Sequence, residues 1–184
     1  MDANSPSRLL ILACAATKRG DAKYLPAIQR YDGPLWRTLR TVDPDGRLAK
    51  VAFLSAHFGF RSADTPIEMY DSRMTREIAV AIKSGGLGTR WPRPKTQRRV
   101  MPSGEHAGMH IAAMTQFGRA PFMEVALVGG HLYLDVMREF VTLFRDGGYL
   151  TANASIIEIK GPIGRMRQNL RLWLLATSGR PADV

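Results

Sequence analysis

Three segments of the sequence gather side chains that could do chemistry, and each directly follows a short apolar run. They span residues 14–24, 56–71 and 129–133. In an open parallel sheet, ligands bind outside the carboxyl ends of the strands. If the apolar runs are parallel strands, we expect the three segments to converge on one site. Their candidate groups are Cys14, Thr17, Lys18, His57, Arg61, Asp64, Glu68, Tyr70, Asp71, His131 and Tyr133.

Two further kinds of chemistry, a thiol nucleophile and a metal ion, have weaker support. Cys14 could be a nucleophile if the charge of Lys18 favoured its thiolate, but we favour a small buried apolar side chain. His106 and His110 have a spacing that can place two ligands on one helix face. No Glu follows His106, however, and the chain has no second cysteine. The glycine motifs of nucleotide-binding loops are also absent, so we expect no metal and no cofactor.

Short apolar runs predict the strands that would position these groups. We expect strands at 8–13, 48–55, 125–129 and 155–159, with a loop over 56–70. Helical patterns begin at Pro34, run from Asp71 or Ser72 to Lys83, and cover 104–117 (capped by Ser103), 133–145 and 162–175. This alternation predicts an α/β fold with a mostly parallel central sheet of about four strands, flanked by helices. The expected core comprises Leu10, Ile11, Leu12, Val51, Phe53, Leu54, Val125, Leu127, Val128 and Ile157.

Length and composition point to one α/β domain over residues 1–184, with a basic insert rich in Gly and Pro at 84–104. A chain of this size can bury a stable core without help from disulfides or bound metals. No apolar run approaches the ~18 residues that a membrane span needs, so no membrane association is expected. A single cysteine excludes an intramolecular disulfide. We therefore expect a cytoplasmic protein.

The charge balance favours a polyanionic partner. Lys plus Arg number 26 against 16 Asp plus Glu, a net charge of +10, which favours DNA or RNA. Two clusters could follow a phosphate backbone, although a disordered loop and a solvated helix face are the alternatives. The predicted nucleic-acid contacts are Arg61; Arg90, Trp91, Arg93, Lys95, Arg98 and Arg99 in the insert; and Lys160, Arg165 and Arg167.

Four further motifs occur in sequence order between about residues 8 and 175, interrupted by the insert. They are Cys14-x-x-Thr17-Lys18, Leu54-Ser55-Ala56-His57-Phe58-Gly59-Phe60 with Tyr70-Asp71, Val128-Gly129-Gly130-x-x-Tyr133, and Gly161-Pro-Ile-Gly164-Arg165-Met166. Together they resemble a family of bacterial and phage domains related to the YaaA peroxide-stress protein. The sequence departs from that family where Phe58 replaces a commoner Tyr.

This resemblance implies a fold related to uracil-DNA glycosylase and to domains of archaeosine-synthesis enzymes, which handle bases in DNA or RNA. It favours a DNA base-processing enzyme, an N-glycosylase that excises a modified base, with a possible role in phage defence. Two alternatives stay open. One is a non-catalytic DNA-binding module of the YaaA type, and the other is a nucleotide N-glycoside hydrolase or transferase.

N-glycosidic cleavage assigns a role to each candidate group. A carboxylate stabilises the sugar cation or activates water, and a donor stabilises the leaving base. Asp71 is the first choice for the carboxylate, with Lys18 and His57 as donors; their alternatives are a helix N-cap, a solvated loop charge and a structural histidine. A flipped base would be held by aromatic and apolar groups. The substrate-binding candidates are Tyr31, Glu68, Tyr70, Gly129, Gly130, His131 and Tyr133.

Overall fold

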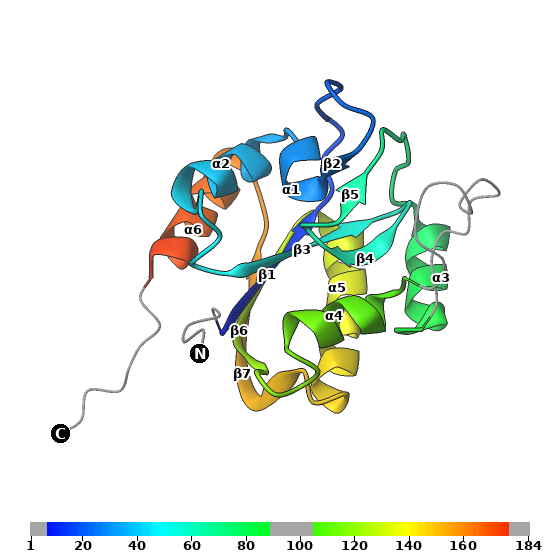
Figure 1. Ribbon diagram of the computed structural model, residues 1–184, viewed down its shortest axis with the longest axis vertical. Coiled ribbons are helices and arrows are strands. Elements are labelled where there is room, and N and C mark those ends of the chain that lie inside the picture. The colour runs from blue at the N-terminus through cyan, green and yellow to red at the C-terminus, as the bar shows by residue number, and fades with distance from the viewer. Residues whose placement is uncertain (1–6, 89–104, 177–184) are drawn as a thin grey trace.

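A mostly parallel five-stranded sheet forms the centre of the molecule (Figure 1). The computed structural model describes residues 7–88 and 105–176. Within them the strand order is β4-β3-β1-β6-β7, and only β4 is antiparallel to its neighbour. The expected α/β class is therefore confirmed, with one strand more than predicted. The strands are β1 (Arg8–Ala13), β3 (Lys50–Ser55), β4 (Gly59–Ser62), β6 (Phe122–Val128) and β7 (Leu150–Ile159).

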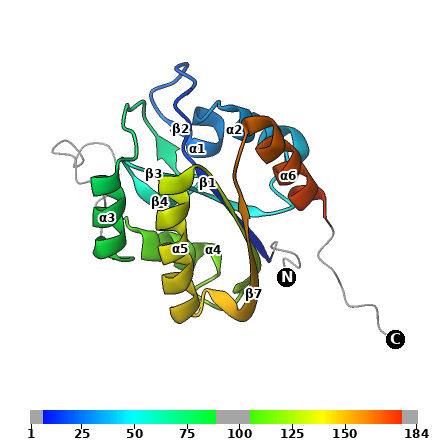
Figure 2. The same ribbon diagram turned by 180° about the vertical axis from the view of Figure 1, so that it is seen from behind.

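Helices cover both faces of this sheet (Figures 1 and 2). One face packs against α1 (Ala27–Arg30), α2 (Pro34–Val42) and α6 (Ile163–Leu175), the other against α3 (Arg76–Gly85), α4 (Ala107–Met114) and α5 (His131–Asp146). Successive side chains of a strand point to opposite faces. Leu10 and Leu12 therefore enter one core, and Leu9 and Ile11 the other. Burial on both faces explains why β1 is apolar along most of its length.

The predicted core residues lie in this sheet. Nine of the ten are buried, and Ile157 is half-buried. β1 has the expected bounds, whereas β6 and β7 begin three and five residues earlier than 125 and 155. The added half of β7 contains the exposed Ala152 and Asn153. Strand formation there depends on pairing with β6, which local apolar character does not reveal.

The segment expected to be a loop, 56–70, contains two strands. A tight turn leads from β3 into β4, and Gly59 has a φ of +66°, which glycine adopts without the steric cost of a Cβ. β5 (Pro66–Ile67) then pairs with β2 (Leu25–Pro26) in a separate two-stranded sheet. The expectation of a loop was wrong because both strands are very short and one begins with proline.

The caps of two helices also differ from expectation. Thr75 caps α3, its hydroxyl accepting a hydrogen bond from the Ile78 N–H at 3.2 Å. Neither Asp71 nor Ser72 serves as that cap. The alternative role of Asp71, as a helix N-cap, is therefore wrong. His106 caps α4 by accepting from the Met109 N–H at 3.3 Å; the expected cap, Ser103, lies outside the described residues.

Across 7–88 and 105–176, every helix is too short or too polar to cross a lipid bilayer.

Candidate functional site

The three candidate segments converge beyond the carboxyl ends of β3, β1 and β6, which are neighbours in the sheet. Cys14 follows β1, and its Sγ lies 3.1 Å from the hydroxyl of Tyr133, in the first turns of α5 after β6. Ser55 ends β3 and donates a hydrogen bond to the Tyr70 hydroxyl at 2.9 Å. The rule that ligands bind at this edge of a parallel sheet therefore locates the site.

Ser55 organises the second segment. Its buried hydroxyl accepts hydrogen bonds from the backbone N–H groups of His57, at 3.0 Å, and Phe58, at 3.2 Å. With both acceptor positions occupied, its single proton goes to Tyr70. The tight turn after β3 and the position of the Tyr70 hydroxyl therefore depend on one serine. From the sequence, Ser55 has no predicted role beyond its place in a motif.

The phenols of Tyr31 and Tyr70 are hydrogen-bonded to each other. The Tyr31 ring is fully buried against Trp36 and Phe53. It cannot stack on a base, so Tyr31 contributes its hydroxyl alone, which corrects the expectation of a substrate-binding ring. Burial raises the pKa of Tyr31 and that of Tyr70, and the nearby Cys14 acts in the same direction. Both phenols are neutral at physiological pH and can donate.

Lys18 lies over the Tyr70 ring, with its Nζ 4.3 Å from the ring centroid. Its backbone forms an antiparallel bridge with Tyr31, which anchors the segment after β1. The side chain is half-buried. Burial lowers the pKa of Lys18, while the charges of Cys14 and Asp71 raise it. Lys18 is therefore part of the cluster through its contact with the Tyr70 ring.

His57 stacks on Tyr70 as well, with ring centroids 5.0 Å apart and planes inclined by 16°. Burial, followed by the charges of Arg61 and Lys18, lowers the pKa of His57, and Glu68 opposes that shift. The imidazole is consequently neutral at pH 7 and offers one N–H donor. With His57 and Lys18 both against its ring, Tyr70 presents its hydroxyl to the site.

The third segment places Tyr133 in the site but gives Gly129 a packing role. A Cβ at Gly129 would lie 2.9 Å from the Ala13 Cβ and 3.2 Å from the Tyr133 Cβ, so close packing of β6, β1 and α5 explains this glycine. Gly130 is the exposed N-cap of α5 and His131 its exposed first residue. Burial raises the pKa of Tyr133, which leaves this phenol neutral as well.

A buried arginine outside the predicted set holds the loop after Lys18 in place. Arg30 has no exposed surface. Its guanidinium donates to the carbonyls of Arg19, Ala22, Lys23 and Ile67. These bonds fasten the segment after β1 to the one that contains Glu68. Arginine can do this because five N–H donors project from one planar group.

The burial of Arg61 contradicts its predicted contact with nucleic acid. Its side chain is 1% exposed because antiparallel β4 places it beneath α4. It forms an ion pair with Glu105 at 2.7 Å and donates to the Phe58 carbonyl at 3.1 Å. A guanidinium enclosed in this way cannot reach a phosphate. It instead supports the turn that carries His57.

His110 is a largely buried titratable group beside Arg61. Its Nδ1 accepts a hydrogen bond from the Ser62 N–H at 3.2 Å, which requires the imidazole to be neutral at that nitrogen. Burial and the charge of Arg61 lower the pKa of His110 to about 4. Since the unfolded side chain titrates near 6.5, the unfolded chain binds the extra proton between these values.

We therefore expect the free energy of unfolding to be highest above pH 6.5 and to fall by about 2–3 kcal/mol as the pH drops from 6.5 to 4. Urea titrations across that range measure it. His110→Asn should remove most of the slope, because Asn can accept from Ser62 without titrating. His131→Asn, on the exposed start of α5, is the control. An unchanged slope in His110→Asn would contradict this assignment.

The predicted basic contacts fall into two groups. Lys160, Arg165 and Arg167 are exposed near the start of α6, and Lys160 also pairs with Glu158 at 3.1 Å. The remaining ones lie outside the described residues: Arg90, Trp91, Arg93, Lys95, Arg98 and Arg99. Among the side chains of 7–88 and 105–176, no three His, Cys, Asp or Glu form a group that could hold a metal ion.

These features define an α/β protein with a cluster of neutral phenols, a lysine and a histidine at the carboxyl edge of its parallel strands, and with the exposed Asp71 directly after Tyr70 in the chain. No protein-family model, no curated protein and no solved structure matches the chain.

Proposed function

We propose that this chain hydrolyses the N-glycosidic bond of a nucleobase within a nucleic acid. The observation that carries the proposal is the packing of Lys18 and His57 against the Tyr70 ring, at 4.3 and 5.0 Å from its centroid, with the carboxylate of Asp71 on the next residue of the chain. Asp71 is exposed and does not cap α3. A carboxylate next to a cluster of hydrogen-bond donors can stabilise the charge separation between sugar and base.

Each group has a defined part in this reaction. The bond between the sugar C1′ and the base nitrogen breaks, its electron pair leaves with the base, and a water oxygen bonds to C1′. Asp71 stabilises the positive sugar and accepts the water proton. Lys18 and the neutral His57 donate hydrogen bonds to the base as negative charge develops on it. The Tyr70 and Tyr133 hydroxyls orient the base.

A polymeric substrate is favoured by the net charge of +10, because phosphate neutralisation supplies much of the affinity of nucleic-acid-binding proteins. The motif resemblance to YaaA-related domains supports the same choice and suggests that the fold is related to uracil-DNA glycosylase. Within the proposal, a target base leaves its stack to reach the loops, and this unstacking costs least for a mismatched, damaged or single-stranded base.

Release of free base is the test. The purified chain is incubated with hypermodified phage DNA, unmodified DNA, transfer RNA and a mixture of free nucleotides, and liberated bases are measured by mass spectrometry. We expect base release from a polymer. Release only from free nucleotides would favour the nucleotide hydrolase or transferase, and polymer binding without release would favour the non-catalytic module. Asp45→Asn, an exposed carboxylate in the turn after α2, is the matched control and should retain full activity.

A further inference from the structure

A groove with polar and cationic walls runs between α2 and α6, on the sheet face opposite α5. It encloses about 320 Å³. Six of its eight lining residues carry a cationic, hydroxyl or amide group, and the other two are Val42 and Gly164. The groups that matter are Arg37, Thr38 and Thr41 on α2, and Arg167, Gln168 and Arg171 on α6.

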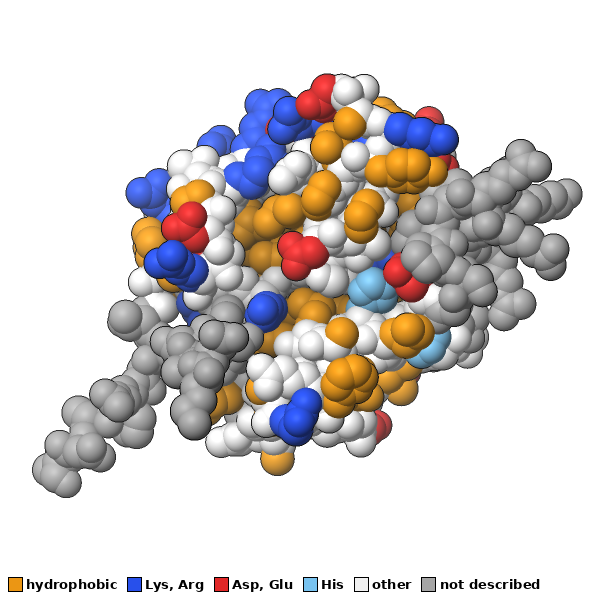
Figure 3. All heavy atoms as spheres, in the orientation of Figure 1, with side chains coloured by type: hydrophobic (Ala, Val, Ile, Leu, Met, Phe, Trp, Pro, Cys, Tyr) orange, Lys and Arg blue, Asp and Glu red, His pale blue; other side chains and the backbone are white. Residues whose placement is uncertain are grey.

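The two helices that form the groove carry positive charge without internal compensation. Their sequences contain five arginines and no Asp or Glu. On α2, Arg37 and Arg40 share one carboxylate, Asp32, at 2.8 and 2.6 Å. On α6, neither Arg167 nor Arg171 has an ion pair with any carboxylate in residues 7–88 and 105–176. Figure 3 shows Lys and Arg side chains gathered at upper left, over α2 and the loop above it.

Neutral contacts hold these cations in position. The Nε of Arg167 donates a hydrogen bond to the Thr38 hydroxyl at 3.1 Å across the groove. The Thr38 hydroxyl in turn donates a hydrogen bond to the Pro34 carbonyl at 2.9 Å. Arg171 follows Arg167 by one helical turn, so both lie on one face of α6. Guanidinium groups arranged this way suit phosphate oxygens, which they bind through paired N–H donors.

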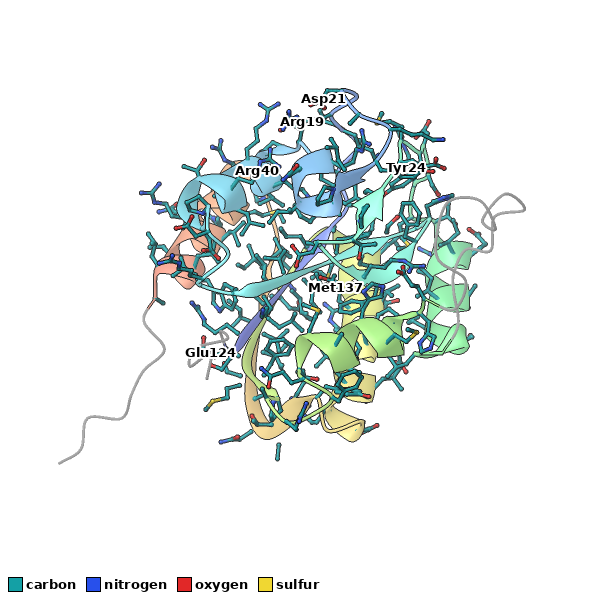
Figure 4. All side chains as sticks on the ribbon, viewed as in Figure 1. Arg19, Asp21, Tyr24, Arg40, Glu124 and Met137 are labelled. Carbon is teal, nitrogen blue, oxygen red and sulfur yellow. The ribbon has the colours of Figure 1, made fainter. Side chains whose placement is uncertain are left out.

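The groove begins at the edge of the sheet that carries the candidate site. The Trp36 indole N–H, in the first turn of α2, donates at 3.0 Å to the carbonyl of Ala13, the residue before Cys14. α6 begins shortly after β7 ends at Ile159. In Figure 4, Arg40 on α2 lies toward the same end of the molecule as Arg19 and Asp21 in the loop after β1.

We infer that the groove between α2 and α6 binds the phosphate backbone of a nucleic acid whose base enters the site. This inference rests on the proposed function. Arg167 and Arg171 contact successive phosphates, with Arg37 on the facing wall. Binding at this groove would make a polynucleotide a better ligand than a nucleotide, independently of the residues that act on the base.

Salt-dependent binding tests the inference. Fluorescence anisotropy with short labelled oligonucleotides, as single-stranded DNA, duplex DNA and RNA, gives the dissociation constant at several KCl concentrations. Log affinity falls linearly with log salt, and each phosphate contact adds about 0.7–0.9 to the steepness, or slope, of that fall. Removing two contacts in Arg167→Gln/Arg171→Gln should lower that slope by about 1.4–1.8 and weaken binding about tenfold near 0.1 M salt. Arg171→Gln alone, at a fully surface position, should give about half the change in slope.

A charge-matched pair separates the groove from net charge. Arg119→Gln/Arg145→Gln removes the same two charges from exposed positions before β6 and at the end of α5, and its binding should change less than twofold. Equal losses in both pairs, or no loss in the groove pair, would overturn the inference. Base release from a trinucleotide is measured in parallel. Its absence in every variant would overturn the proposed function alone, since binding through the groove does not depend on turnover.

Discussion

Asp71→Asn should lower the rate of base release by about 10²–10⁴-fold, the range typical of a positioned acid or base. The substitution keeps the size of the side chain and removes its charge. The sugar cation then loses its counter-charge, and the attacking water loses its base. Single-turnover measurement of liberated base separates this chemical step from product release.

Folding should be unchanged in this variant, because Thr75 and not Asp71 caps α3. Nucleic-acid affinity should hold or rise, since a negative charge near phosphates is removed. Glu68→Gln is the comparison, because its charge acts on His57. If Asp71→Asn retains full activity while Glu68→Gln loses it, the catalytic carboxylate is Glu68 and the assignment of Asp71 is wrong.

Arg30→Met should lower the free energy of unfolding by about 3 kcal/mol, and Tm by roughly 6–12 °C. Methionine fills much of the same volume but leaves the carbonyls of Arg19, Ala22, Lys23 and Ile67 without their donor. Buried carbonyls without partners are costly, and relief of the buried charge offsets only part of that cost. Base release should also fall, because Lys18 precedes the loop that Arg30 fastens.

Arg19→Met is the control for Arg30. Arg19 is exposed, and its guanidinium pairs with Asp21 on the surface, so its loss should cost less than about 1 kcal/mol. Arg30→Lys should destabilise nearly as much as Arg30→Met, because one ammonium group cannot reach all of these carbonyls. Equal stability of the Arg30 and Arg19 variants in urea titrations would show that the loop does not depend on the buried guanidinium.

The position of the site could be predicted from the sequence because it follows from one topological rule. Apolar runs mark β1, β3 and β6, and the polar segments behind them meet at one sheet edge once the strands are parallel. The predicted Lys18, His57, Tyr70 and Tyr133 come together there through local strand order.

The supporting residues could not be predicted because their roles depend on distant partners. Ser55 resembles any serine at the end of a strand until Tyr70 reaches it. Arg30 ends a four-residue helix and could have been a surface charge; the carbonyls around it belong to the loop after β1 and to β5, which fold back over it. Arg61 looks available to a phosphate until β4 pairs with β3 and α4 covers it. The hydrophobic pattern of a sequence predicts which apolar residues are buried locally. It does not reveal that a polar side chain is enclosed by segments distant in the chain.

The central position of β1 determines when the site can exist during synthesis. β1 pairs with β3 on one side and with β6 on the other, so the first part of the chain can form β1, β3 and β4 before β6 has left the ribosome. Cys14 and Tyr133 are 119 residues apart in sequence. Contacts of such separation close large loops and form slowly. Until β6 arrives, one edge of β1 has no partner, and an unpaired apolar strand can join a second chain. Completion of the site and protection of that edge from aggregation are therefore the same event in folding.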